Sequence, residues 1–149
     1  KCGAVLDASK EAKEVKKAIY KALDDAGINK NEIDYINLHG TGTLANDTME
    51  SEAINSVFGI NVPVSSTKPL TGHCLGAAAS IETVLCCHLL NNFNGKLLPH
   101  INDNEYNNVL KPVNLVKLTD DYRKCDICMS NSFGFGGTNA IIILGKKND

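Results

Sequence analysis

The stretch INLHGTGT, from Ile36 to Thr43, joins the pattern of a strand to a glycine-rich turn. An apolar run ends on His39, and Gly-Thr-Gly-Thr follows at once, which removes nearly all side-chain bulk from the turn. Two interpretations compete. The stretch is either a plain tight turn with a surface histidine, or a site where backbone, hydroxyls and imidazole converge on a ligand.

The sequence on both sides of this stretch alternates helical and strand patterns. Apolar residues at helical spacing predict a helix before it, and Asn46 is a suitable N-cap for a helix after it. A glycine ends each of these two patterns. A long apolar run with small residues at its start predicts a further helix. The expected elements are helices over Ser9–Ala26, Asn46–Phe58 and His73–Leu90, and strands over Asp34–Leu38 and Val62–Ser65.

The last third of the chain predicts paired strands. Residues 91–114 are rich in Asn, Asp and Pro and read as irregular, with a short strand near Leu97–Leu98. Two β-like runs follow, Cys125–Ser132 and Asn139–Leu144, and the glycines of GFGG join them as a hairpin. The order predicts an α/β fold, in which helices cover a mixed sheet with an antiparallel edge.

Composition narrows the class of protein. The chain has 149 residues, 43% of them hydrophobic and 21% charged, which fits one globular domain. The net charge is −2 and the basic residues are scattered, so no nucleic-acid footprint is present. No apolar run reaches the length of a membrane span. Cys86 and Cys87 are neighbours in a helical pattern, which predicts reduced thiols and a cytoplasmic location.

Three charged or polar side chains stand out in the segment that follows the second strand and continues through the long helix. His73 begins the small-residue part of that helix, where the helix dipole would keep its ring neutral and able to donate to an oxyanion. The alternative is a capping histidine without chemistry. Glu82 lies among apolar residues, where a carboxylate needs a partner. Lys68 is one candidate partner, and a solvent-facing Glu82 is the alternative.

Two glycine- or cysteine-containing motifs are weaker. Phe135 lies between glycines in GFGG, which fits a mobile flap, and the alternative is a turn with Phe135 packed in the core. Cys125 and Cys128 form a C-x-x-C pair, yet residues three apart on a strand point to opposite faces, so we expect the thiols to diverge. We therefore expect no metal site there.

Three segments are rich in Gly, Ser and Thr: HGTGT (39–43), SSTKPLTGHCLGAAAS (65–80) and NSFGFGGTNA (131–140). Taken together and in this order, they resemble the C-terminal half of the β-ketoacyl–acyl-carrier-protein synthases. The resemblance runs from about residue 11 to residue 144. It implies a thiolase-like fold and a decarboxylative Claisen condensation of acyl and malonyl thioesters, in fatty acid or polyketide synthesis. The pair of histidines resembles the elongating synthases, since the initiating ones resemble a Cys-His-Asn arrangement.

The resemblance also implies roles for individual residues. His39 and His73 match the two histidines that donate hydrogen bonds to the malonyl thioester carbonyl and stabilise the enolate. Lys68 and Glu82 match the lysine and glutamate that hold the His73 side of the site. The remaining matches concern substrate binding: Thr41 and Thr43 for the pantetheine arm, and Phe135 and Gly136 for the gate and the oxyanion hole.

One departure from the family is large. The nucleophilic cysteine of the family lies in an N-terminal half that has no counterpart here, and nothing activates Cys74 in its place. We therefore expect residues 1–149 to be the C-terminal domain of a longer or two-part enzyme, inactive alone. The expected partners are acyl carrier protein, the N-terminal half and a second subunit in a homodimer or heterodimer. The substrates travel on phosphopantetheine, and no cofactor is implied.

Two other functions remain open at this point. A non-catalytic subunit of the chain-length-factor type shares the fold but lacks the working cysteine, although such a subunit has no use for both histidines and Lys68. A free-standing binding module is the third candidate function. Acyl chain length and the pathway are not encoded in these residues.

Overall fold

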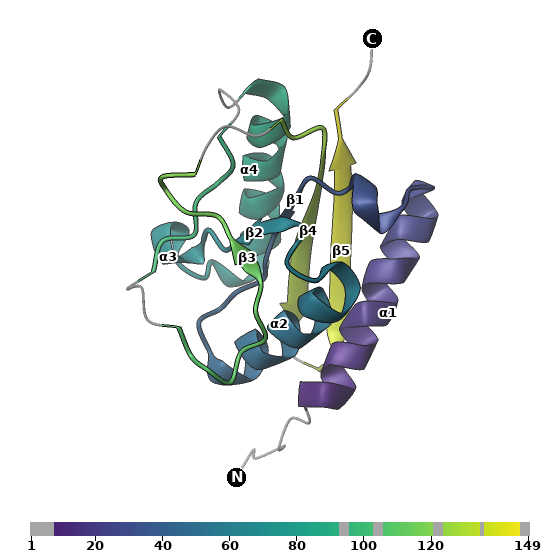
Figure 1. Ribbon diagram of the computed structural model, residues 1–149, viewed down its shortest axis with the longest axis vertical. Coiled ribbons are helices and arrows are strands. Elements are labelled where there is room, and N and C mark those ends of the chain that lie inside the picture. The colour runs from purple at the N-terminus through teal and green to yellow at the C-terminus, as the bar shows by residue number, and fades with distance from the viewer. Residues whose placement is uncertain (1–7, 93–95, 103–105, 121–123, 135, 147–149) are drawn as a thin grey trace.

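The computed structural model describes residues 8–92, 96–102, 106–120, 124–134 and 136–146. Five strands form one mixed sheet in the order β3-β2-β1-β4-β5 (Figure 1). Their bounds are Tyr35–Asn37 (β1), Pro63–Ser65 (β2), Asn114–Leu115 (β3), Ile127–Gly134 (β4) and Thr138–Gly145 (β5).

Pairing places the carboxyl ends of the inner strands at one edge. Ile36 of β1 lies in parallel register between Val64 of β2 and Met129 of β4, and β2 is parallel to β3. Among the described strands, β4 and β5 form the one antiparallel pair. The α/β class with an antiparallel edge is confirmed. Because β2 and β3 lie on one side of β1 and β4 and β5 lie on the other, the strand order reverses between β1 and β4, and the ends of these two strands are a usual place for a site.

Helices cover both faces of the sheet. The longer ones are α1 (Ala8–Ala26), α2 (Leu44–Phe58) and α4 (Ala78–Asn92), and the shorter ones are η1 (Lys30–Glu32), α3 (Lys68–Thr71) and η2 (Leu75–Ala77). Figure 1 shows α4 on the opposite side of the sheet from α1. One apolar core lies under α1 and α2, and a second lies under α4. Among the described residues no helix is long and apolar enough to cross a membrane.

Three local predictions are wrong. Thr43, not Asn46, is the N-cap of α2, and its hydroxyl accepts the Asn46 N–H at 3.4 Å. The apolar pair Leu97–Leu98 is not a strand, because it is buried in the core under α4, and the edge strand forms at Asn114–Leu115 instead. His73 does not begin a helix, since it lies in the turn between α3 and η2.

The prediction that the C-x-x-C thiols diverge is also wrong. Cys125 precedes β4 at a bend, and both Cys125 and Cys128 are buried beside Cys86 of α4. Hydrogen bonds from Cys125 and Cys86, together with burial, raise the pKa of the Cys128 thiol. In the described part of the chain no group of three or more His, Cys, Asp or Glu side chains is arranged to hold a metal ion.

Candidate active site

A buried carboxylate fixes the turn that follows β1. The backbone N–H of His39 donates to Glu50 Oε1 at 2.9 Å, and that of Gly40 donates to Oε2 at 2.8 Å. Asn131 of β4 donates a third hydrogen bond to Oε1 at 3.1 Å. Burial raises the pKa of the Glu50 carboxyl, and the donated bonds oppose that rise. One side chain of α2 therefore holds the His39 turn against β4.

Position 40, directly after His39, requires glycine for two reasons: a close contact with Ser66 and a left-handed backbone conformation. Gly40 has φ of +41°, and a Cβ placed there would lie 2.5 Å from the Cβ of Ser66. The Ser66 hydroxyl donates to the Gly40 carbonyl at 2.8 Å, so the two residues are in direct contact. Only a residue without a side chain fits between β1 and the end of β2 at this point.

Replacing Gly40 by alanine should lower the free energy of unfolding by about 3 kcal/mol, because the new methyl group adds overpacking to left-handed strain. Gly42→Ala is the matched control, since Gly42 also has positive φ but nothing lies within 4 Å of a Cβ there. We expect Gly42→Ala to cost only about 1 kcal/mol. Denaturant unfolding measures both. Equal losses for the two variants would contradict the Ser66 contact.

The two imidazoles of the predicted pair meet. The ring centroids of His39 and His73 are 5.4 Å apart, with an angle of 86° between the ring planes. Phe133 of β4 packs on the other side of His39, at 5.5 Å between centroids. His39 is only 7% exposed, whereas His73 is exposed. Residues that are far apart in the sequence are thus brought to one edge of the sheet.

Both rings can donate a hydrogen bond, and the His39 ring is held uncharged. Burial, with the positive charge of Lys68 and the neighbouring His73, lowers the pKa of His39 to about 4. His73 Nδ1 accepts the backbone N–H of Leu75 at 3.3 Å, so the neutral ring carries its proton on Nε2. His39 Nδ1 is buried and has no hydrogen-bond partner among the described residues. The pair can donate to an oxygen that develops negative charge.

The predicted Lys68–Glu82 pair forms. Lys68 Nζ and Glu82 Oε1 make a salt bridge between α3 and α4, and their side chains are only 5% and 2% exposed. Burial raises the pKa of the Glu82 carboxyl, and the Lys68 ammonium opposes the rise. A buried pair of this kind places a positive charge close to His39 without leaving that charge uncompensated. The alternative of a solvent-facing Glu82 is excluded.

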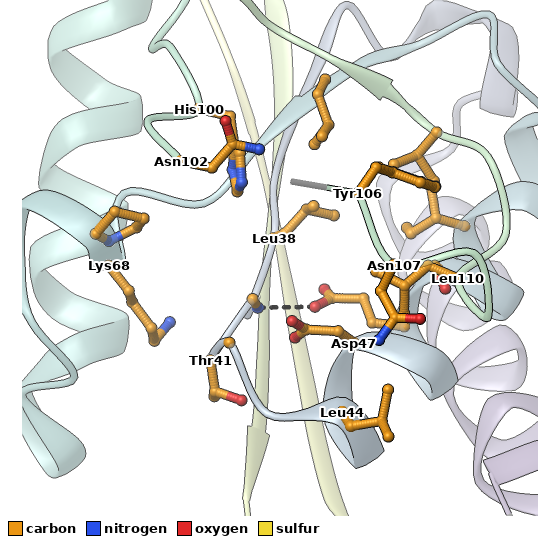
Figure 2. A pocket seen from close by; sticks show the side chains of 18 of the residues that line it. Leu38, Thr41, Leu44, Asp47, Lys68, His100, Asn102, Tyr106, Asn107 and Leu110 are labelled. Atoms are coloured by element: carbon orange, nitrogen blue, oxygen red, sulfur yellow. Dashed lines mark hydrogen bonds between the residues drawn. The ribbon is translucent and has the colours of Figure 1, made fainter. Parts of the chain in front are cut away.

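A cavity of about 660 Å³ opens beside the histidine turn. Figure 2 shows Lys68 and His100 on one side of it, and Asp47 and Leu44 of α2 on the other. His73 and Thr41 also line it. Aliphatic side chains from Leu38, directly after β1, from α2 and from the segment before β3 form much of the remaining wall. The cavity can hold a slender ligand with an apolar body and a few polar groups.

The predicted substrate-binding residues divide into three groups. Thr41 lines the cavity, and its hydroxyl lies 3.0 Å from the Thr43 hydroxyl, which caps α2. Gly136 lies in the turn between β4 and β5 with φ of +84°. Phe135 lies outside the described residues, so the flap and core interpretations are not distinguished.

Glu50 and Ser66 were not among the residues predicted from the sequence. Glu50 is 2% exposed and lies beside Met49 among the buried residues of α2. An acidic residue at a helix position where the spacing predicts an apolar one could have indicated it from the sequence. Ser66 offered no signal, because its role comes from contacts with residues 26 and 34 positions away.

Comparisons with known proteins agree with this geometry. Residues 4–103 match the family described as "Beta-ketoacyl synthase, C-terminal domain". The chain is 44% identical over 117 residues to "3-oxoacyl-[acyl-carrier-protein] synthase 1" of Haemophilus influenzae, covering 78% of this chain and 28% of that protein. The chain therefore spans less than a third of that relative.

Solved structures with the same fold include ketosynthases. One is "Ketosynthase (ApeO) in Complex with its Chain Length Factor (ApeC) from Xenorhabdus doucetiae", with a TM-score of 0.81 and 46% identity over 89% of this chain and 33% of that one. Another is "The ishigamide ketosynthase/chain length factor", with a TM-score of 0.84 and 36% identity over 92% and 34%. The fold is that of the thiolase-like ketosynthases. The chain belongs to the β-ketoacyl synthase C-terminal domain family.

Proposed function

We propose that this chain is the C-terminal domain, residues 1–149, of a 3-oxoacyl-acyl-carrier-protein synthase that condenses acyl and malonyl thioesters. The observation that carries the proposal is the His39–His73 pair, edge to face at 5.4 Å, beside the buried Lys68–Glu82 pair. Two imidazoles that each donate a hydrogen bond into one site are suited to stabilise an enolate oxygen. The family membership supports the same reaction class.

The proposed chemistry begins with the malonyl thioester carbonyl between the two imidazoles. The bond from the α-carbon to the carboxylate breaks, carbon dioxide leaves, and the electron pair moves onto the thioester oxygen as an enolate. Protons on His39 and His73 stabilise that oxygen. The enolate carbon then attacks an acyl thioester held on a cysteine elsewhere in the full-length protein. A new carbon–carbon bond forms, and the cysteine leaves as a thiolate.

Lys68 and Glu82 support the imidazoles. The Lys68 charge contributes to the low pKa of His39, so that ring stays neutral at the pH of the cell. Glu82 balances the charge of Lys68 and ties α3, which leads into the His73 turn, to α4. A lysine without this partner would carry an isolated charge in a buried position.

Substrate binding is proposed for the residues around the two turns. The Thr41 hydroxyl faces the cavity and would contact the pantetheine arm, with Thr43 behind it at 3.0 Å. Gly136, whose backbone adopts positive φ, would accompany Phe135 at the gate and oxyanion hole. The substrates arrive on the phosphopantetheine of an acyl carrier protein, and the reaction as proposed needs no cofactor.

The domain would act only together with its N-terminal half, which carries the nucleophile, in a dimer of like or related subunits. Three large apolar side chains are exposed near the His73 turn and on α4: Leu70 (67%), Leu75 (73%) and Val84 (55%). Apolar surface of this kind usually meets another part of a protein. The N-terminal half would cover this surface and supply the nucleophile, so the domain alone is expected to be inactive.

A cytoplasmic location remains part of the proposal. The described residues include five free thiols, at Cys74, Cys86, Cys87, Cys125 and Cys128, a state that persists in reducing compartments.

A chain-length-factor subunit is the second candidate. The similarity to solved ketosynthase structures that also contain a chain length factor supports this candidate. The presence of His39, His73 and Lys68 in one site favours the catalytic subunit, since a subunit without a nucleophile has no enolate to stabilise. The residue at the nucleophile position of the full-length protein separates the two, with cysteine for the enzyme and glutamine for the partner.

Release of labelled carbon dioxide from malonyl-acyl carrier protein tests the proposed function. We expect the full-length protein to release it and to form a 3-oxoacyl product when an acyl donor is added. Residues 1–149 alone should form no product. A full-length protein that binds malonyl-acyl carrier protein but neither decarboxylates nor condenses would contradict the enzyme and support the chain-length factor.

A further inference from the structure

His100 lies at the wall of the cavity and is held there by the backbone. Its own N–H donates to the carbonyl of Val116 at 2.8 Å, next to the end of β3. The ring is half-buried, and Figure 2 shows it on the same side of the cavity as Lys68. His100 Nδ1 accepts the backbone N–H of Ser66 at 3.1 Å. The ring therefore touches the residue that directly follows β2.

Ser66 connects the two turns that carry the candidate catalytic residues. It is 1% exposed. Its hydroxyl donates to the carbonyl of Gly40, the residue after His39, at 2.8 Å. The same hydroxyl oxygen accepts the backbone N–H of Lys68 at 3.3 Å. A shift of Ser66 would therefore move the His39 turn and the Lys68 backbone together.

The bond to Ser66 fixes the protonation state of His100. A ring nitrogen that accepts a hydrogen bond carries no proton, so the neutral ring holds its proton on Nε2. Asp47 of α2 faces the ring from across the cavity, and Glu50, Lys68 and His73 line the same space. Burial lowers the pKa of His100, while the Asp47 charge opposes the decrease. The ring is thus neutral near pH 7, and the bond to Ser66 is intact.

We propose that His100 is a positioning residue for the condensation reaction, which holds Ser66 and through it the spacing of the His39 and Lys68 turns. The inference rests on the proposed function, because it assigns His100 a role in that reaction. Protonation of Nδ1 in acid places a donor against the Ser66 N–H and breaks the bond. His100 does not touch the reacting atoms in this proposal.

The test uses a matched pair of variants in the full-length protein. In His100→Asn, Oδ1 takes the place of Nδ1 and can accept the Ser66 N–H, without a titrating ring. In His100→Leu the side chain has nearly the same shape and no acceptor. We expect His100→Leu to lower kcat for malonyl decarboxylation about tenfold with little change in KM, and His100→Asn to recover most of the rate.

The pH profile adds a readout that a merely structural role would not move. The His100 pKa lies below its ordinary value of 6.5, so the wild-type rate should fall on acidification through an ionisation that His100→Asn lacks. The remaining acid limb should then follow the ionisation of His39, at about pH 4. Superimposable acid limbs for the wild type and His100→Asn would overturn the proposal.

Hydrogen exchange of the Ser66 amide separates this proposal from the proposed function. The amide should exchange about tenfold faster in His100→Leu than in the wild type or His100→Asn, because its acceptor is lost. Amide exchange can be measured in a protein without activity. A full-length protein that fails to decarboxylate would therefore refute the proposed function, while the Ser66–His100 hydrogen bond could still be tested. Equal exchange in all three proteins, or faster exchange in His100→Leu with unchanged kcat, would overturn the role of His100.

Discussion

Replacing His73 by alanine in the full-length protein is expected to slow malonyl decarboxylation by about a hundredfold or more. The variant removes one of the two donors proposed for the same oxygen, and the His39 ring, 5.4 Å away between centroids, cannot occupy both positions. Because His73 is exposed in this domain and its backbone lies in a turn, the fold should survive the change. Labelled carbon dioxide release measures the rate.

The control for this prediction is another histidine. His88 is exposed on α4 and does not line the cavity, so His88→Ala should decarboxylate at the wild-type rate. His73→Gln should stay slow, because its amide cannot reproduce the ring geometry. A His73→Ala protein that retains the wild-type rate would remove His73 from the catalytic residues and with it the paired-donor mechanism.

Breaking the Lys68–Glu82 pair is expected to produce the largest loss of stability. Glu82→Gln leaves the Lys68 ammonium buried without a counter-charge, and Lys68→Met leaves the Glu82 carboxylate in the same position. Each single variant should lower the free energy of unfolding by about 3–5 kcal/mol, because removing one partner of a buried pair strands the other. Denaturant unfolding of the full-length protein measures the loss.

The double variant Lys68→Met/Glu82→Leu distinguishes a stranded charge from lost packing. Apolar side chains of similar volume fill the same space, so its stability should return close to that of the wild type. Its decarboxylation should stay slow, since the Lys68 charge beside His39 is gone. Single variants that lose less than about 1 kcal/mol would mean that the pair behaves as an exposed one.

Local patterns allowed much of this fold to be predicted. The strand before His39, the helices on either side of it and the hairpin around GFGG follow from periodicity and glycine positions within short windows. The predicted pairing of Lys68 with Glu82 was confirmed, because a carboxylate in an apolar helix needs a cation nearby. The predicted meeting of His39 with His73 depended on the family resemblance, since nothing local joins residues so far apart in sequence.

The wrong predictions share a physical cause, namely tertiary contacts that override local preference. Leu97 and Leu98 have the apolar pattern of a strand, but in the structure they are buried in the core under α4 without forming one. The bend before β4 turns Cys125 toward Cys128, against the alternation of a regular strand. Glu50 escaped notice because three of its donors, the His39 and Gly40 N–H groups and Asn131, come from two segments far from it in sequence, and only the folded chain brings them together.

The position of β1 in the sheet determines when the site can form. Ile36 pairs with Val64, which lies nearby in the chain, and also with Met129, which is synthesised much later. Non-local pairings of this kind slow folding, and the ribosome delivers β4 after every other part of the site except the β4–β5 turn. The hydrogen bond from Asn131 to Glu50 can form only after β4 has been synthesised. A nascent chain that stops short of β4 holds both imidazole-bearing turns without the strand that fixes them.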